Sequence, residues 1–338
     1  MGLHVLWFFL LGVLLTGYAI LDGFDLGVGS LHLFVRDDRE RRILLNSIGP
    51  LWDGNEVWLV TFGGALFAAF PRAYATAFST FYLPFMLLLF ALIFRAVSIE
   101  FRSKQELRAW RAFWDVSFTA ASMLATFLFG VAVGNSMQGL PIGADGEFTG
   151  NLLSLLRPYP ILVGVLALTV FAMHGSIYLH LKTEGALQER IHGWMWRTFG
   201  LFIVAFMLTT IFTLVFVPEA TRNFQQMPLA WLVVVLNVLA IANIPRAIYS
   251  NRPGYAFISS ACVIAALMFL FGVTLFPNMI VSSIDPAYSL TITNAASSEK
   301  TLSIMRTIAL VGMPFVLAYT TVVYWVFRGK VKLGTFSY

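Results

Sequence analysis

The first 21 residues read MGLHVLWFFLLGVLLTGYAIL (Met1–Leu21) and contain no Asp, Glu, Lys or Arg. A helix needs about 20 mostly apolar residues to cross the hydrocarbon core of a bilayer, so this stretch predicts a transmembrane helix that continues towards Val35. Working outward along the chain, eight further stretches lack the same four residue types: 57–71, 73–94, 116–137, 158–181, 198–218, 223–245, 253–280 and 307–327. A membrane barrel would instead show alternating segments of about 10 residues. The sequence therefore predicts an all-α integral membrane protein with nine transmembrane helices.

Composition supports this fold class and excludes others. Of the 338 residues, 59% are hydrophobic and 12% are charged, whereas a soluble domain carries roughly a quarter charged residues. The net charge is +5, but the basic residues stand in short clusters between apolar runs. This favours membrane lipids over nucleic acid as their partner. The single cysteine, Cys262, excludes disulfides and metal–thiolate sites within the chain. No basic segment precedes Arg36, so we expect no cleavable signal peptide.

The distribution of Lys and Arg predicts the orientation in the membrane. Of the 22 basic residues, 17 lie in the loops after the first, third, fifth and seventh expected helices and in the C-terminal tail. The other side holds Arg72, Arg157, Arg222, Lys300 and Arg306. Because short cytoplasmic loops hold the excess of basic residues, we expect the N-terminus outside and the C-terminus inside. The two longest connections, 137–158 and 280–307, then both face outside.

Two carboxylates stand in the segment DGFDLGVG at 22–29, near the end of the first expected helix. Ionisable groups inside a membrane are costly, and they usually line a cavity or pair with one another. Asp22 and Asp25 are three residues apart and so share one helix face. Two anions in a poorly solvated site cannot both ionise easily, so one is expected to hold a proton, as a proton relay requires. The alternative is that the helix ends near Asp22 and both carboxylates are solvated. Gly23 and Gly27 form a small-xxx-small pattern, which favours close helix packing.

The second polar cluster is PLWDGNEVW at 50–58. The charge-free stretch that follows it has only 15 residues, fewer than a span needs, so the second helix must include part of the cluster. Asp53, Asn55 and Glu56 are then expected at the cytoplasmic edge of the hydrocarbon, where they would form a proton entrance. An alternative that does not exclude the first is a helix N-terminus whose carboxylates complement the helix dipole while Trp52 anchors at the interface.

A third charged segment, FRAVSIEFR at 94–102, ends the third expected helix. Arg95 is a candidate partner for a carboxylate of the first two clusters, and Glu100 is a second structural or charge-pairing residue. The alternative for Arg95 is simple anchoring at the cytoplasmic interface. Asp115, just before the fourth expected helix, is expected to be a helix cap or an interface residue.

Histidines decide whether the chain can hold a haem itself. Of His4, His32, His174, His180 and His192, only His174 lies deep in an expected span. His180 is six residues further on, about 120° away around a helix, so these two side chains cannot face one haem. We therefore expect a buried packing role for His174, and no haem or metal ligated by this chain. Nucleotide-binding and hydrolase motifs are also missing from the sequence, so catalysis by the chain alone is unsupported.

The polar segments extend into longer motifs. They are LDGFDLGVG at 21–29, ERRILLNSIGPLWDGNEVWLV at 40–60, GGALFAAFP at 63–71 and FRAVSIEFRSK at 94–104. Together these motifs resemble subunit II of the cytochrome bd ubiquinol oxidases. The similarity is strongest over roughly the first 140 residues and continues more weakly to the C-terminus, including 279–302 before the last expected helix.

The resemblance implies an architecture and a complex. The architecture is two four-helix bundles, within 1–140 and 155–280, with a ninth peripheral helix and a cytoplasmic tail at 304–338. The complex is a terminal oxidase of a bacterial or archaeal plasma membrane that oxidises quinol, reduces O2 to water and generates a proton motive force. Its subunit I would carry haem b558, haem b595 and haem d, while this chain ligates none. Small single-helix accessory subunits and a bound quinone or lipid are further candidate partners.

The resemblance also implies a proton pathway from the cytoplasm, carried by Asp53 of WDGNEVW and by Asp22 and Asp25 of DGFD, with Trp52 and Asn55 in support. One competing hypothesis is a proton-coupled secondary transporter or channel that uses the same carboxylates. The others are a cytochrome that binds haem by itself and a purely structural scaffold for subunit I.

Overall fold

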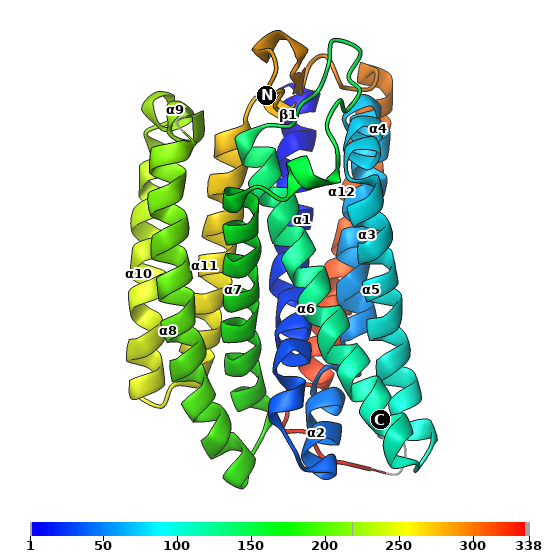
Figure 1. The fold of residues 1–338 in the computed structure, drawn as a ribbon, viewed down its shortest axis with the longest axis vertical. Coiled ribbons are helices and arrows are strands. Elements are labelled where there is room, and N and C mark those ends of the chain that lie inside the picture. Colours follow the sequence, from blue (N-terminus) through cyan, green and yellow to red (C-terminus); the bar gives the residue numbers. More distant parts are fainter. Residues whose placement is uncertain (1, 218, 335–338) are drawn as a thin grey trace.

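The computed structural model describes residues 2–217 and 219–334, and long helices that run side by side dominate it (Figure 1). Eight helices within these ranges are long and apolar enough to cross a membrane. They are α1 (Leu3–Leu31), α5 (Tyr82–Phe101), α6 (Arg108–Gln138), α7 (Pro158–Lys182), α8 (Gly185–Phe216), α10 (Leu229–Tyr249), α11 (Pro253–Leu275) and α12 (Glu299–Val326). A helical membrane protein is thereby confirmed, whereas the count of nine spans stays a prediction.

The second expected span corresponds to α3 (Trp52–Ala69), which packs along α1. Its 18 residues begin with Trp52, so the helix includes the polar cluster that the short charge-free stretch required. The third expected span, 73–94, is divided between α4 (Pro71–Thr80) and α5, which begins at Tyr82. Proline suits the first position of α4 because the backbone N–H that it lacks would have no partner within the helix there.

Several helices extend beyond the charge-free stretches of the sequence. α6 begins at Arg108 rather than near 116, α8 at Gly185 rather than near 198, and α12 at Glu299 rather than near 307. The expected helices ended at their first charged residue. Charged side chains at helix ends can, however, reach water or pair with one another, so the helices continue past them. The reverse error occurs at 223–245, where α9 (Glu219–Gln226) is separate from α10.

The two long connections meet at one end of the molecule, near the N-terminus (Figure 1). One contains the short helix η3 (Leu152–Leu155); the other contains the antiparallel strands β1 (Asn278–Ile280) and β2 (Leu290–Thr291) and the helix η4 (Pro286–Tyr288). The Leu140 backbone N–H donates to the Val281 carbonyl, 2.9 Å away, and so joins them. α2 (Asp38–Ile48) and the C-terminus lie at the opposite end, which we call the α2 end. Two further short helices are η1 (His32–Phe34) and η2 (Arg102–Lys104).

α1 and α7 cross in backbone contact. A Cβ atom built on Gly27 would lie 1.9 Å from the Phe171 carbonyl oxygen, and one built on Gly175 would lie 2.6 Å from the Gly27 carbonyl carbon. Only glycine permits this approach, so the small-residue pattern expected at Gly23 and Gly27 does mark a helix contact. The crossing places the DGFD segment of α1 in the middle of the helix assembly.

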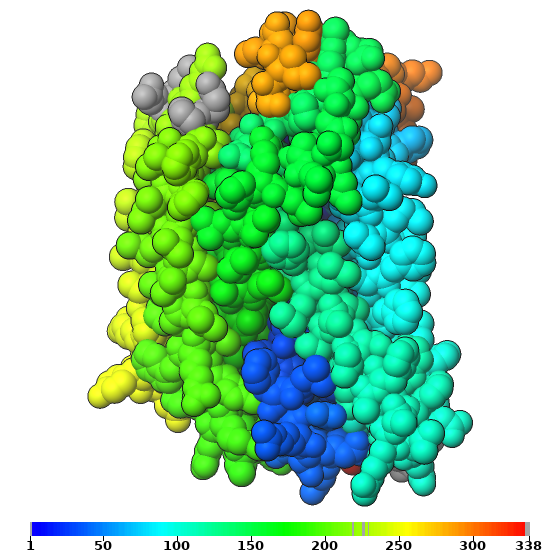
Figure 2. Space-filling model, viewed as in Figure 1, coloured from blue at the N-terminus to red at the C-terminus, as the bar shows by residue number. Residues whose placement is uncertain are grey.

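The rest of the packing separates a shared core from an apolar surface. One buried cluster takes side chains from α1, α5, α6, α7, α8, α10 and α11, so both halves of the chain contribute to it. Figure 2 shows the face over α6 and α8, with α2 at its lower end. Large apolar side chains such as Leu201, Val204 and Ile211 of α8 are exposed. In a membrane, such a surface contacts lipid.

Candidate functional site

Asp22 of α1 and Arg95 of α5 form an ion pair in the interior. Both side chains are completely buried. The Arg95 Nη1 donates to Asp22 Oδ2 at 2.7 Å, and its Nη2 donates to Asp22 Oδ1, so the contact is bidentate. This geometry is the strongest that a guanidinium and a carboxylate can adopt. Arg95 is therefore a partner of an intramembrane carboxylate, and anchoring at the interface does not describe it.

Asp25 has a different environment, although it lies one turn from Asp22. It too is fully buried, but its Oδ2 accepts from the Asn55 amide Nδ2 at 2.7 Å, and its Oδ1 has no hydrogen-bond partner among the described residues. α1 continues to Leu31, so the alternative that the helix ends near Asp22 and leaves both carboxylates solvated is wrong. The two carboxyl groups thus form one pair in which a single member has a cation.

The polar residues at the start of α3 lie near Asp22, Asp25 and Arg95, and they differ in how far they are exposed to solvent. Asn55 is buried, Glu56 is half-buried with 24% of its side chain exposed, and Asp53 is exposed. The Glu56 Oε1 lies 3.4 Å from Arg95 Nη1. Asp53 and Glu56 are three residues apart and share one helix face. The structure therefore arranges the carboxylates of α3 from the surface inward, towards Arg95.

Two predicted residues lie outside this cluster. Trp52 is half-buried and packs among apolar side chains between α1, α2 and α7. Glu100 is half-buried and has no ion pair with any residue that the structure describes. Of the two residues expected to pair charges, Arg95 thus has carboxylate partners within the described residues and Glu100 has none.

A second buried ion network lies at the α2 end, and sequence reasoning missed it. Asp115 is 1% exposed and sits in the third turn of α6. It accepts from His32 Nε2 at 2.5 Å, Arg102 Nε at 2.6 Å and Arg41 Nη1 at 2.7 Å. Arg102 also contacts Asp38 of α2 at 2.7 Å. The expectation that Asp115 caps a helix is wrong, because α6 begins at Arg108 and Asp115 lies inside it; a place at the membrane interface stays a prediction.

Sequence reasoning also missed Tyr324 of α12. Its hydroxyl donates to the Asn55 Oδ1 at 2.8 Å, across 269 residues of sequence. A tyrosine among the apolar residues of the last helix carries no local signal of this contact. Tyr18, one turn before Asp22 on α1, is buried as well, unlike the half-buried Tyr324.

His174 has the packing role that the sequence predicted. Its Nδ1 lies 2.7 Å from the Ser260 Oγ and its Nε2 lies 3.2 Å from the Ile20 carbonyl oxygen. The ring stacks on Phe257 at 4.7 Å between centroids. Both ring nitrogens are engaged, so His174 does not fit an axial haem ligand. Within the described ranges, no group of three or more His, Cys, Asp or Glu side chains is arranged to hold a metal ion.

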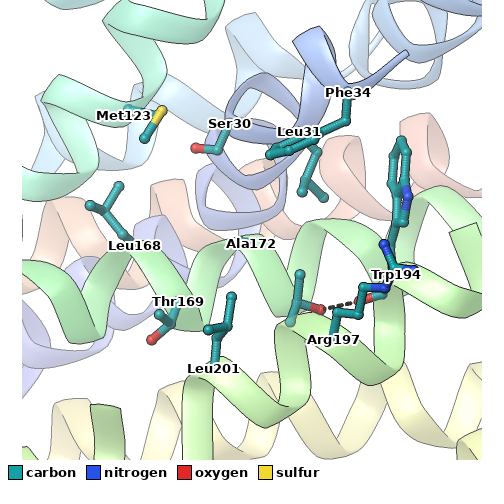
Figure 3. A pocket seen from close by; sticks show the side chains of 11 residues that line it. Ser30, Leu31, Phe34, Met123, Leu168, Thr169, Ala172, Trp194, Arg197 and Leu201 are labelled. Carbon is teal, nitrogen blue, oxygen red and sulfur yellow. Dashed lines mark hydrogen bonds between the residues drawn. The ribbon is translucent and has the colours of Figure 1, made fainter. Parts of the chain in front are cut away.

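An apolar pocket of about 330 Å³ opens between α1, α6, α7 and α8. Figure 3 shows Trp194 and Arg197 of α8 at one end and Met123 and Leu168 at the other. Arg197 is exposed. The pocket thus has an aromatic and a basic side chain at one end and apolar side chains at the other.

The site gathers an exposed, a half-buried and two buried carboxyl groups on neighbouring helices, in a graded path from the surface to the interior. Carboxylates that line such a path are the groups from which intramembrane proton relays are built.

Known proteins resemble the chain over nearly its whole length. The family model described as "Cytochrome bd terminal oxidase subunit II" matches residues 3–327. Subunit 2 of the cytochrome bd-I ubiquinol oxidase of Escherichia coli (strain K12) is 36% identical, over 97% of this chain and 95% of that protein. Subunit 2 of the cytochrome bd ubiquinol oxidase of Bacillus subtilis (strain 168) is 37% identical, over 98% and 97%.

A solved structure also resembles the chain. A chain in the structure of bd oxidase from Geobacillus thermodenitrificans superposes with a TM-score of 0.81 at 18% sequence identity. The superposition covers 97% of this chain and 99% of that one. At this identity, the match shows a shared fold.

Proposed function

Because the chain belongs to the cytochrome bd terminal oxidase subunit II family, we propose that it supports a haem-bearing subunit I and conducts protons to the oxygen-reducing site. Family membership makes the chain part of an oxidoreductase complex with a partner subunit, in the bacterial plasma membrane. It also favours the oxidase over a transporter or channel. Proton conduction is the part that the arrangement of carboxylates supports.

One observation carries the proposal: the carboxylates of the packed helices α1 and α3 form a series from the surface to the interior, and Arg95 lies beside two of them. Asp53 takes up protons at the surface, and Glu56 passes them inward beside Arg95. Asp22 is held by Arg95, which leaves the unpaired Asp25 as the buried group that binds and releases the proton. A buried carboxyl without a cation is costly to ionise, so it holds a proton until a neighbouring acceptor takes it.

The proposed topology has nine spans with the N-terminus outside. α3 supplies the ninth span, because it connects the α2 end with the opposite end beside α1 (Figure 1). The basic residues then place the α2 end in the cytoplasm, and Asp53 at the start of α3 faces the proton source. We keep the division into 1–140, 155–280 and 304–338 as part of this proposal.

Asp53→Asn is expected to cut quinol-dependent oxygen consumption by the purified two-subunit complex about tenfold. This is less than the roughly 100-fold loss typical of a proton-transfer group at reacting atoms, because water still reaches the half-exposed Glu56. The haem content, read from the reduced-minus-oxidised spectrum, stays normal.

Glu189→Gln is the matched control for Asp53→Asn, because Glu189 is another exposed carboxylate near the α2 end. It should leave turnover unchanged. Normal oxygen consumption in the Asp53→Asn variant would show that protons enter elsewhere.

A further inference from the structure

The last helix reaches the buried carboxylates through a single polar contact. α12 is otherwise peripheral, because none of its most apolar stretch is buried inside the chain. Tyr324 is half-buried, and its ring lies edge-on to Phe24 at 6.5 Å between centroids. Its hydroxyl donates to the Asn55 Oδ1, and Asn55 in turn donates to Asp25.

The hydrogen bonds of Asn55 are complete and directional. An amide has an oxygen that accepts and a nitrogen that donates two hydrogens, and either end can occupy the same space. Here the oxygen accepts from Tyr324, while the nitrogen donates to Asp25 Oδ2 at 2.7 Å and to the Leu21 carbonyl at 3.2 Å. The donor to the amide oxygen is thus a hydroxyl from a different helix.

This direction matters for the proton on Asp25. An N–H that points at a carboxyl oxygen stabilises the anion, whereas an amide oxygen at the same place stabilises the protonated acid. The charged and titratable groups that face Asp25 from the surrounding helices are Asp22 on α1, Glu56 on α3, Arg95 on α5, Tyr178 on α7 and Tyr324 on α12. Asn55 is the only described side chain that donates a hydrogen bond to Asp25.

Hydrogen bonds in the segment that follows Tyr324 hold the end of α12 in place. Lys182, at the end of α7, donates to the Phe327 and Gly329 carbonyls, and Lys330 donates to the Thr183 carbonyl at 2.7 Å. These two lysines satisfy carbonyls at the C-terminal ends of each other's helices. The tail therefore holds α12 at a set height against α7, three residues from Tyr324.

We propose that Tyr324 is a positioning residue that keeps the nitrogen of the Asn55 amide directed at Asp25 and so eases release of the Asp25 proton. This rests on the proposed function, in which Asp25 carries protons. Without the hydroxyl, the amide oxygen loses its donor, and besides the bond to Asp25 itself only the longer bond to the Leu21 carbonyl holds the amide in this orientation. Rotation of the amide then presents the oxygen to Asp25 and favours the protonated acid.

Tyr324→Phe tests this in the purified complex, because it removes one hydroxyl and keeps the ring. The carbonyl band of protonated Asp25, isolated by subtracting the infrared spectrum of Asp25→Asn, is followed against pH. Its titration midpoint should move to higher pH by about half a unit to one unit, a threefold to tenfold change, which is the scale of one ordinary hydrogen bond. The alkaline limb of the turnover profile should move in the same direction.

Tyr319→Phe is the matched control, because Tyr319 is on the same helix and 67% exposed; it should change neither readout. An unchanged Asp25 band in Tyr324→Phe overturns the positioning role. Full turnover in Asp25→Asn overturns the proposed function instead, and the infrared titration still decides the role of Tyr324.

Discussion

Arg95→Met is expected to destabilise the complex by about 3–5 kcal/mol, the cost of removing one partner of a buried ion pair. Asp22 would then lie completely buried without the guanidinium that donates hydrogen bonds to both of its oxygens. Glu56 would also lose the cation that stands 3.4 Å away. Most of this cost comes from leaving the Asp22 carboxylate buried without a cation. The attraction between Asp22 and Arg95 contributes less to the net stability, because burying the pair already costs desolvation free energy.

Thermal unfolding of the detergent-solubilised complex, with the yield of assembled complex, measures this effect. Arg190→Met is the control, because Arg190 pairs with Glu40 at the surface with 52% of its side chain exposed, and such pairs contribute at most about 1 kcal/mol. The double variant Asp22→Leu/Arg95→Met should recover most of the loss, since both charges are gone. If the single variant were as stable as the Arg190 variant, the pair would be solvated in the membrane.

Gly27→Ala is expected to prevent close packing of α1 on α7 and to cost about 3 kcal/mol or more, at the upper end for overpacking. The added Cβ would meet the Phe171 carbonyl oxygen at 1.9 Å. Backbone cannot move aside as a flexible side chain can, so the helices must separate. Their separation would loosen the setting of Asp22 and Asp25, which lie within two turns of Gly27 on α1.

Gly12→Ala is a matched control on the same helix, because its Cβ would meet no described atom within 4 Å. It should be neutral or slightly stabilising, since alanine favours helix more than glycine does. The comparison uses the fraction of chain recovered in the complex and the unfolding midpoint. Equal values for the two variants would mean that the α1–α7 contact relaxes freely.

The sequence predicted which segments form long helices better than it predicted where those helices end. It also predicted which segments are polar better than it predicted which of their charged side chains form ion pairs. The apolar runs identify helices because a bilayer demands about 20 such residues. Asp115 was misplaced because charged residues continue a helix when partners such as Arg102 satisfy them. Spacing along α1 could not decide whether Arg95 pairs with Asp22 or with Asp25, because both carboxylates share one face. That choice depends on Asn55, which reaches Asp25 from another helix.

The contact between Tyr324 and Asn55 has a consequence for the order of biosynthesis. Chains emerge from the ribosome N-terminal end first, so α1 and α3 enter the membrane long before α12. The Asn55 amide obtains its hydroxyl donor only after α12 has been inserted. The hydrogen bonds of Lys182 and Lys330 form at the same stage. Until then, the carboxylate path exists without its final geometry. If the proposed pathway holds, the nascent subunit stays immature with respect to proton transfer until its last helix is in place.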